Sequence, residues 1–130
     1  MTVAYLDASA LVKLVISEQE SGALRDYLTH FQTLVSSKLA RVEVTRAVSA
    51  RVPTRANEVT SALRHLRYVG LDDTILETAS ELPPSVLRAL DAIHIASALA
   101  LGDALEVFVT YDRRMAEAAE ALGIPVVAPA

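Results

Sequence analysis

Short apolar runs alternate with segments of helical periodicity along this chain, and this alternation limits its fold more than any other feature. The runs lie at residues 3–7, 33–37, 68–72, 106–110 and 125–129. Helical spacing of apolar residues predicts helices at residues 9–16, 18–29, 38–52, 54–67, 73–82, 87–101 and 112–123. Strands that alternate with helices favour a mainly parallel sheet covered on both faces, so the sequence predicts an α/β fold.

Length and composition limit the architecture and the compartment. At 130 residues the chain is long enough for one core and too short for two ordinary domains, so a single domain over residues 1–130 is expected. No cysteine is present, which excludes disulfides and thiolate metal sites and fits a reducing cytoplasm. No basic segment precedes the first apolar run, and no apolar run reaches a membrane-spanning length. The sequence therefore predicts a soluble, unprocessed cytoplasmic protein with no membrane segment.

Basic side chains are concentrated in one part of an acidic chain. The formal net charge is -4, which argues against a general nucleic-acid coat. Between residues 38 and 67, however, only Glu43 and Glu58 oppose a group of basic residues: Lys38, Arg41, Arg46, Arg51, Arg55, Arg64 and Arg67. This segment is suited to contact a polyanion, although two solvated helix faces explain the same pattern equally well.

Asp91 raises a question of its own, because it lies in the first half of a predicted helix that is apolar on nearly every face. An unpaired ionised carboxylate is costly to bury, so it must reach water, bind a proton or meet a positive charge. A helix cap does not explain this acid if the helix begins near Ser85. The answer therefore depends on which other acids can reach the same place.

Three further acids are predicted to lie at one edge of the sheet. In an open parallel sheet, ligands bind outside the carboxyl ends of the strands. Asp7 ends the first run, Asp112 lies two residues past Thr110 at the end of the fourth, and Glu43 lies in the first turns of the helix after the second. Each also has a structural explanation: Asp7 and Asp112 as helix caps, and Glu43 as a solvated helix residue.

A shared site would answer the question that Asp91 raises. Carboxylates a few ångströms apart raise one another's pKa unless a cation neutralises them. Mg²⁺ and Mn²⁺ prefer carboxylate oxygen and retained water, so acids without cysteine favour these ions over zinc. Ser9 and Thr110 supply hydroxyls nearby, either as cap and strand-end groups or as partners of metal-held water. His94, one turn beyond Asp91, is expected to be a packed, hydrogen-bonded residue rather than a metal ligand, and Tyr5 a core residue.

At this point the sequence resembles a known family, the PIN-domain ribonucleases, and within them the VapC toxins of bacterial toxin-antitoxin pairs. The matching segments are YLDASALVKL, RVEVTRAV, LRALDAIHIASAL and VTYDRRMAEAAEALGIPVVAP, which together extend over nearly the whole chain. The resemblance implies a three-layer α/β/α sandwich around a five-stranded, mainly parallel sheet. It also implies a catalytic, metal-binding quartet with two supporting hydroxyls: Asp7, Glu43, Asp91 and Asp112, with Ser9 and Thr110.

The same resemblance implies a Mg²⁺- or Mn²⁺-dependent endoribonuclease that acts as a toxin, forms a homodimer and is inhibited by a VapB-type antitoxin. Hydrolysis of RNA phosphodiesters would leave a 5′ phosphate and a 3′ hydroxyl. The basic segment would then guide RNA into the site, with Arg46 and Arg51 as candidate contacts. Four acids do not predict the RNA target, the number of metal ions or the identity of the antitoxin.

Two other functions remain open on the residues alone. A phosphotransfer domain with Asp7 as nucleophile also combines a parallel sheet with Mg²⁺. A phosphatase of the haloacid dehalogenase type, however, has a second acid two residues on, where Ser9 stands here. A non-catalytic module would instead bind a partner protein through its apolar helices and use its acids as caps, and it predicts no effect of divalent ions on stability.

Overall fold

One parallel sheet forms the centre of the protein. The computed structural model describes residues 2–130. Its strands are β1 (Val3–Leu6), β2 (Thr33–Ser37), β3 (Arg67–Val69), β4 (Leu105–Val109) and β5 (Val126–Val127). They lie in the order β3-β2-β1-β4-β5, and every neighbouring pair is parallel. The predicted five-stranded sheet is confirmed, and the carboxyl ends of all its strands lie at the same edge.

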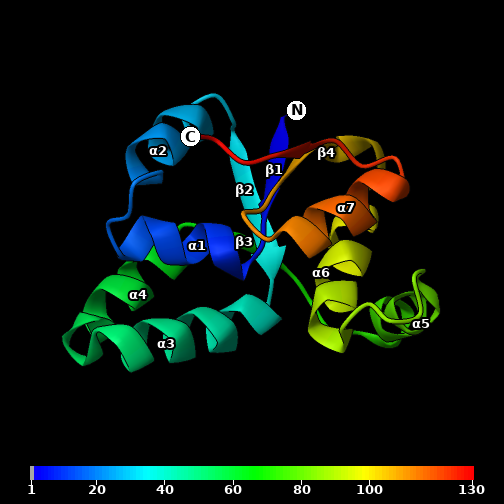
Figure 1. Ribbon diagram of the computed structural model, residues 1–130, viewed down its shortest axis with the longest axis horizontal. Coiled ribbons are helices and arrows are strands. Elements are labelled where there is room, and N and C mark those ends of the chain that lie inside the picture. The colour runs from blue at the N-terminus through cyan, green and yellow to red at the C-terminus, as the bar shows by residue number, and fades with distance from the viewer. Residues whose placement is uncertain (1) are drawn as a thin grey trace.

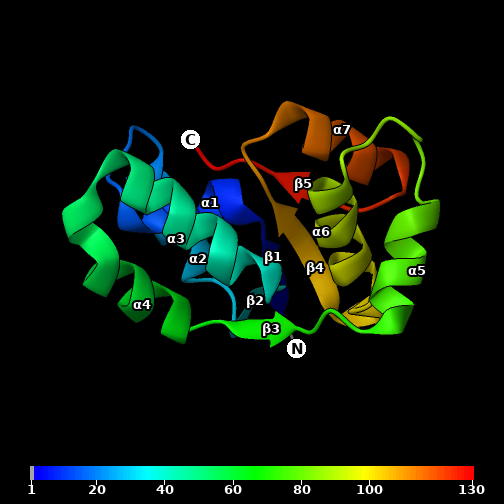
Figure 2. The same ribbon diagram turned by 90° about the horizontal axis from the view of Figure 1, so that it is seen from below.

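Helices cover both faces of this sheet. On one side lie α1 (Ala8–Val15), α2 (Ser21–Leu28), α3 (Leu39–Arg51) and α4 (Ala56–Arg64); on the other lie α6 (Ala89–Leu99) and α7 (Arg113–Ala121), with α5 (Asp73–Glu81) packed against α6 (Figures 1 and 2). Two short 3₁₀ helices, Pro53–Arg55 and Gly102–Ala104, join neighbouring elements. The three-layer α/β/α sandwich is therefore confirmed. None of the helices formed by residues 2–130 has the length and hydrophobicity needed to cross a bilayer.

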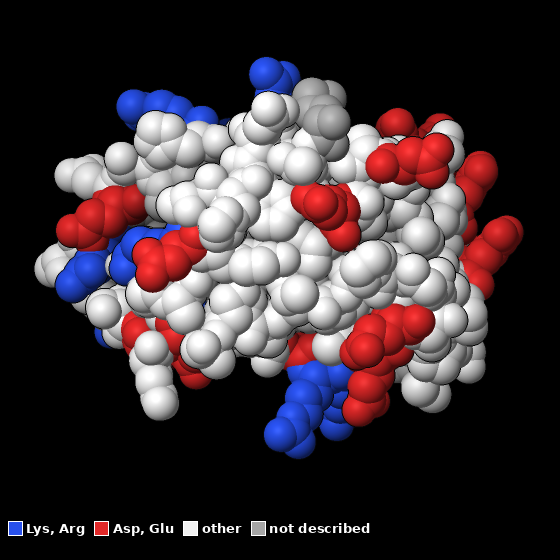
Figure 3. All heavy atoms as spheres, turned by 90° about the horizontal axis from the view of Figure 1, so that it is seen from above, with Lys and Arg blue, Asp and Glu red and all other residues white. Residues whose placement is uncertain are grey.

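The surface at the amino ends of the strands differs from the edge where the predicted acids gather. Figure 3 views the molecule from above Figure 1, the side on which β1 begins. Acidic side chains are scattered over this face, and the basic ones lie toward its margins. Because like charges repel, this face is poorly suited to a polyanion.

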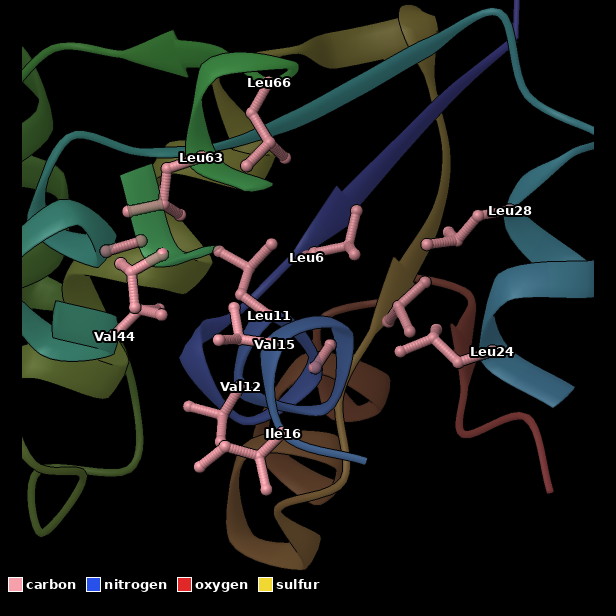
Figure 4. Close-up of a cluster of buried hydrophobic side chains, with 14 of the residues drawn as sticks. Leu6, Leu11, Val12, Val15, Ile16, Leu24, Leu28, Val44, Leu63 and Leu66 are labelled. Carbon is pink, nitrogen blue, oxygen red and sulfur yellow. The ribbon is translucent and has the colours of Figure 1, made fainter. Parts of the chain in front are cut away.

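The central strand β1 shows why its sequence is apolar without alternation. Side chains point to opposite faces of a sheet in turn, and all four residues of β1 are buried. Ala4 and Leu6 pack into a cluster with residues of α1 to α4, part of which Figure 4 shows around Leu6 and Leu11. Val3 and Tyr5 pack into a second cluster with residues of α6, β4 and α7. A strand with a core on each face needs no polar side.

Two strand boundaries differ from the prediction. The third strand was expected at residues 68–72 but covers only Arg67–Val69, because the chain turns away toward Asp72, whose side chain accepts a hydrogen bond from Ile75 N and caps α5. The fifth, expected at 125–129, is limited to Val126–Val127. Its flanking prolines, Pro125 and Pro129, have no amide hydrogen to donate to a neighbouring strand.

The start of α6 changes the interpretation of Asp91. The expectation that this helix begins near Ser85 is wrong. Leu87 N donates a hydrogen bond to Pro84 O, and this turn postpones the helix until Ala89. Asp91 therefore lies in the first helical turn, where the helix dipole favours an acid. The dipole explains the choice of an acid there, but it supplies no hydrogen-bond partner.

Candidate active site

Asp7 lies immediately after β1 and is held at both carboxylate oxygens. Ser9 Oγ and the amide of Ala10 donate to Oδ1 at 2.6 and 3.1 Å, and Thr110 Oγ1 donates to Oδ2 at 2.6 Å. Burial raises the pKa of Asp7 above its ordinary value, and the hydrogen bonds from Ser9 and Thr110 oppose that rise. Asp7 does cap α1, as its structural explanation predicts. A cap uses one oxygen, however, and Thr110 fixes the second.

Ser9 and Thr110 also join the segments that follow β1 and β4. Ser9 Oγ accepts a hydrogen bond from the amide of Tyr111 at 2.9 Å, and Thr110 Oγ1 accepts one from the amide of Asp112 at 3.1 Å. The two hydroxyl oxygens are 3.4 Å apart. The predicted supporting hydroxyls therefore set the position of Asp7 and of the backbone that leads to Asp112.

Asp91 and Asp112 are close enough to interact. Asp112 Oδ1 caps α7 by accepting hydrogen bonds from the amides of Arg114 and Met115 at 2.9 and 3.4 Å. Asp91 Oδ2 is buried and has no hydrogen-bond partner among residues 2–130. The nearest cation is Arg88 Nε at 3.7 Å, which is too far for a hydrogen bond. Burial and the negative charge of Asp112 raise the pKa of Asp91, whereas Arg88 lowers it.

Glu43 is bound to a buried histidine. Glu43 Oε1 lies 2.6 Å from His94 Nε2, and Tyr5 Oη lies 2.7 Å from His94 Nδ1. The interpretation of Glu43 as a merely solvated residue is therefore wrong, and the expectation that His94 is packed and hydrogen-bonded is confirmed. With both ring nitrogens occupied, His94 has none left for a metal ion. Sequence reasoning placed Tyr5 in the core but missed its link to this site, because its apolar neighbours give no sign of a polar contact.

Electrostatic effects link three of the predicted acids to one another and Asp7 to His94. The charges of both Asp112 and Glu43 raise the pKa of Asp91, and His94 lowers that of Asp7 and Asp91. Asp91 therefore interacts with Asp112 and Glu43, and Asp7 is connected to this group through His94. Among the residues that the structure describes, no three acid or histidine side chains surround a single point closely enough to hold a metal ion by themselves. The acids form an open group rather than a closed cage.

A hollow of about 650 Å³ opens beside Asp91. Its apolar walls come from the turn before α6 and from α7, with Val86, Leu87 and Leu122 among them. Arg88, Arg114 and Glu117 also line it, so the hollow holds two cations and, with Asp91, two acids.

The two candidate RNA contacts on α3 have different surroundings. Arg46 is exposed one helical turn after Glu43 and forms no ion pair with any residue from 2 to 130. Arg51 lies 3.6 Å from Glu18 and is partly neutralised by it. The structure thus leaves the charge of Arg46 available near the acids, and less of the charge of Arg51.

Comparison with known proteins identifies the family. The profile of the PIN domain matches residues 4–121. Ribonuclease VapC46 of Mycobacterium tuberculosis is 46% identical over 129 residues, which cover 99% of each chain. Among solved structures, VapC20 of the same organism, a toxin that cleaves the sarcin-ricin loop, has a TM-score of 0.76 at 17% identity over 97% of this chain and 99% of its own. VapBC2 of Rickettsia felis, bound to promoter DNA, has a TM-score of 0.71 at 13% identity over 99% of this chain and 100% of its own. The chain therefore belongs to the PIN-domain family, and within it to the VapC ribonucleases.

Proposed function

We propose that this protein is the toxin of a VapBC-type pair and that it cleaves RNA with Mg²⁺ or Mn²⁺ held by its acidic quartet. The observation that carries the metal site is the buried, unpartnered oxygen of Asp91 beside a second carboxylate. Such an oxygen is costly unless a cation meets it. The exposed Arg88, at 3.7 Å, is a weak substitute.

The donor set fits a hard divalent cation. All its ligand atoms are oxygens, and protein sites for Mg²⁺ use one or two carboxylates together with retained waters and substrate phosphates. The absence of a closed cage among residues 2–130 is compatible with that mode of binding. Asp7 and Asp91 would be the direct ligands. Asp112 and Glu43 would hold a second ion or the waters around the first.

Within this site the chain's own residues position the reacting groups. A bound Mg²⁺ would supply a Lewis acid for the phosphoryl oxygen and would lower the pKa of water. Ser9 and Thr110 fix the two oxygens of Asp7, so that its carboxylate cannot rotate. In-line attack of water would leave a 5′ phosphate and a 3′ hydroxyl on the cleaved RNA.

The proposal includes a VapB-type antitoxin, a homodimer and action in the cytoplasm. Support for a protein partner comes from large apolar side chains that are exposed, among them Val42 at 58%, Val86 at 86% and Leu90 at 48%. A partner protein would remove these apolar side chains from water. The Rickettsia felis relative of the same fold is itself a VapBC protein.

A cleavage assay on total cellular RNA tests the function. Antitoxin-free protein with Mg²⁺ or Mn²⁺ is expected to release discrete fragments, which disappear with EDTA and return when Mg²⁺ exceeds the chelator. Fragments of equal intensity with and without EDTA would contradict the metal site. Absence of fragments at any divalent-ion concentration would favour the non-catalytic module, and a phosphorylated Asp7 would favour phosphotransfer.

Replacing Arg46 tests whether the basic segment guides RNA. The Arg46→Ala variant should bind RNA more weakly and reduce the slope of log K against log salt concentration by about 1, because one phosphate contact is lost. Binding is measured in an Asp91→Asn background so that the RNA stays intact. The matched change Arg51→Ala should have a smaller effect, since Glu18 already neutralises part of that charge. An unchanged slope in Arg46→Ala would make Arg46 an ordinary solvated residue.

A further inference from the structure

We infer that His94 is a positioning residue that fixes the carboxylate of Glu43, and that Tyr5 in turn fixes His94. The inference rests on the proposed function, because it assigns Glu43 to the catalytic quartet. It adds two residues outside the quartet to the machinery of the site.

The three residues come from separate elements and form one continuous chain of hydrogen bonds. Tyr5 lies in β1, His94 in α6 and Glu43 in α3; the two contacts measure 2.7 and 2.6 Å and join residues 89 and 51 positions apart. Tyr5 is fully buried and His94 is 1% exposed, whereas the Glu43 side chain is 21% exposed. This series of hydrogen bonds therefore leads from the buried core to a carboxylate that a ligand can reach.

The chemistry of the groups gives the chain a direction. A carboxylate accepts hydrogen bonds and donates none, so the bond between His94 and Glu43 requires a proton on Nε2. The tyrosine hydroxyl, which both donates and accepts, meets the other ring nitrogen. Burial raises the pKa of Tyr5 well above its ordinary value, which keeps its hydroxyl proton in place. With both nitrogens engaged, the imidazole is held in one orientation.

Core packing prevents Tyr5 and His94 from moving. Tyr5 stacks on Phe108 with ring centroids 5.1 Å apart and planes at 16°. His94 meets the Tyr5 ring edge-on, with centroids 5.9 Å apart and planes at 77°. Rotation of the imidazole would require the stacked core to open, so the position of Nε2 is set by the packed interior.

Two features separate this arrangement from an ordinary buried polar network. Only Oε1 of Glu43 is held, and Oε2 has no hydrogen bond to any residue between 2 and 130. In addition, α3 and α6 belong to helical layers on opposite faces of the sheet (Figure 2). The contact between Glu43 and His94 joins these two helices. Asp91 lies one turn before His94 on α6. The contact thus sets the distance between two acids of the quartet and leaves one oxygen of Glu43 for chemistry.

The first test is a double-mutant cycle on RNA cleavage. His94→Leu should lower kcat about 10- to 100-fold and leave KM nearly unchanged, as is usual for groups that orient metal ligands or their waters. His94→Gln keeps an N–H donor and should recover part of kcat. If His94 acts through Glu43, His94→Leu should have no further effect in a Glu43→Ala background. If kcat of the double variant fell by the product of the two single-variant losses, the inference would be overturned.

The second test needs no activity. The chain has three histidines, and His30 and His65 are exposed, so His30→Gln and His65→Gln assign the imidazole signals in an NMR spectrum. The Nε2 proton of His94 should exchange slowly and resonate downfield in the wild type, and both features should disappear in Glu43→Ala. Tyr5→Phe keeps the stacking on Phe108 and should shift the same signals. Its control, Tyr27→Phe, alters a half-buried tyrosine beside Phe31 that is remote from His94 and should not shift them.

The two readouts separate failure of the inference from failure of the function. An unchanged Nε2 signal in a folded Glu43→Ala variant would overturn the proposed link, whatever the activity. A wild type that shows the expected signal but cleaves no RNA with any divalent ion would contradict the proposed function, and with it the catalytic role of His94.

Discussion

The Asp91→Asn variant is expected to cleave RNA at least about a hundredfold more slowly than the wild type, since even groups that only orient metal ligands contribute 10- to 100-fold. Without metal at pH 7 the same variant is expected to unfold at a higher temperature. Burial and the charge of Asp112 raise the pKa of Asp91, so the ionised carboxylate opposes folding at neutral pH. The amide removes this charge and keeps the size of the side chain. Single-turnover cleavage and thermal unfolding in EDTA measure the two effects.

Asp103→Asn provides the matched control. Asp103 is exposed in the 3₁₀ helix before β4, at the amino ends of the strands, and its replacement changes the net charge equally. Cleavage by this variant should equal that of the wild type. Wild-type cleavage by Asp91→Asn would remove Asp91 from the site. A lower unfolding temperature for Asp91→Asn in EDTA would show that its carboxylate stabilises the fold, contrary to the raised pKa.

Divalent ions are expected to reverse the pH dependence of stability. In EDTA, the raised pKa values of Asp7 and Asp91 mean that the folded state binds protons more tightly than the unfolded state. Their contribution to stability is therefore complete below the unfolded pKa of about 4 and is lost as the pH rises through the folded values. With Mg²⁺ at pH 7, binding to the folded state should stabilise it, by about 2.7 kcal/mol when the ion is at 100 times its Kd. Protons compete with the ion, so this gain should shrink as the pH falls.

The measurement compares urea unfolding between pH 5 and 7, with Mg²⁺ or with NaCl of equal ionic strength. The double variant Asp7→Asn/Asp91→Asn should lose both the response to Mg²⁺ and the part of the pH dependence that these acids supply. Equal stability of the wild type with and without Mg²⁺ would favour the non-catalytic module. If the contribution of Asp7 and Asp91 to the free energy of unfolding decreased toward pH 5 in EDTA, this result would contradict their raised pKa values.

The sheet and the location of most of the site follow from local patterns. Strands buried on both faces produce apolar runs, and parallel strands gather their carboxyl ends at one edge, so Asp7 and Asp112 could be placed from the sequence. The helical cap roles of both acids were predicted from the same positions and are confirmed. The resemblance to PIN-domain ribonucleases added the three-layer sandwich and the prediction that the four acids form one catalytic quartet, which spacing alone did not supply.

Long-range polar contacts could not be predicted in the same way. Nothing near Tyr5 in the sequence indicates that its hydroxyl meets a histidine 89 positions away. Ser9 and Thr110 were expected near the site. Their hydrogen bonds to the two oxygens of Asp7, however, depend on the register between β1 and β4. The start of α6 was misplaced because the turn closed by Pro84 and Leu87 delays the helix, an effect of backbone geometry rather than of apolar spacing.

The hydrogen bond between Asp7 and Thr110 spans 103 positions of the chain. A ribosome that synthesises this protein therefore adds 103 residues after Asp7 before Asp7 can meet Thr110. Until β4 pairs with β1, the second oxygen of Asp7 lacks this partner. Under the proposed function, a nascent chain that has not yet reached β4 would carry no complete site for cleaving RNA.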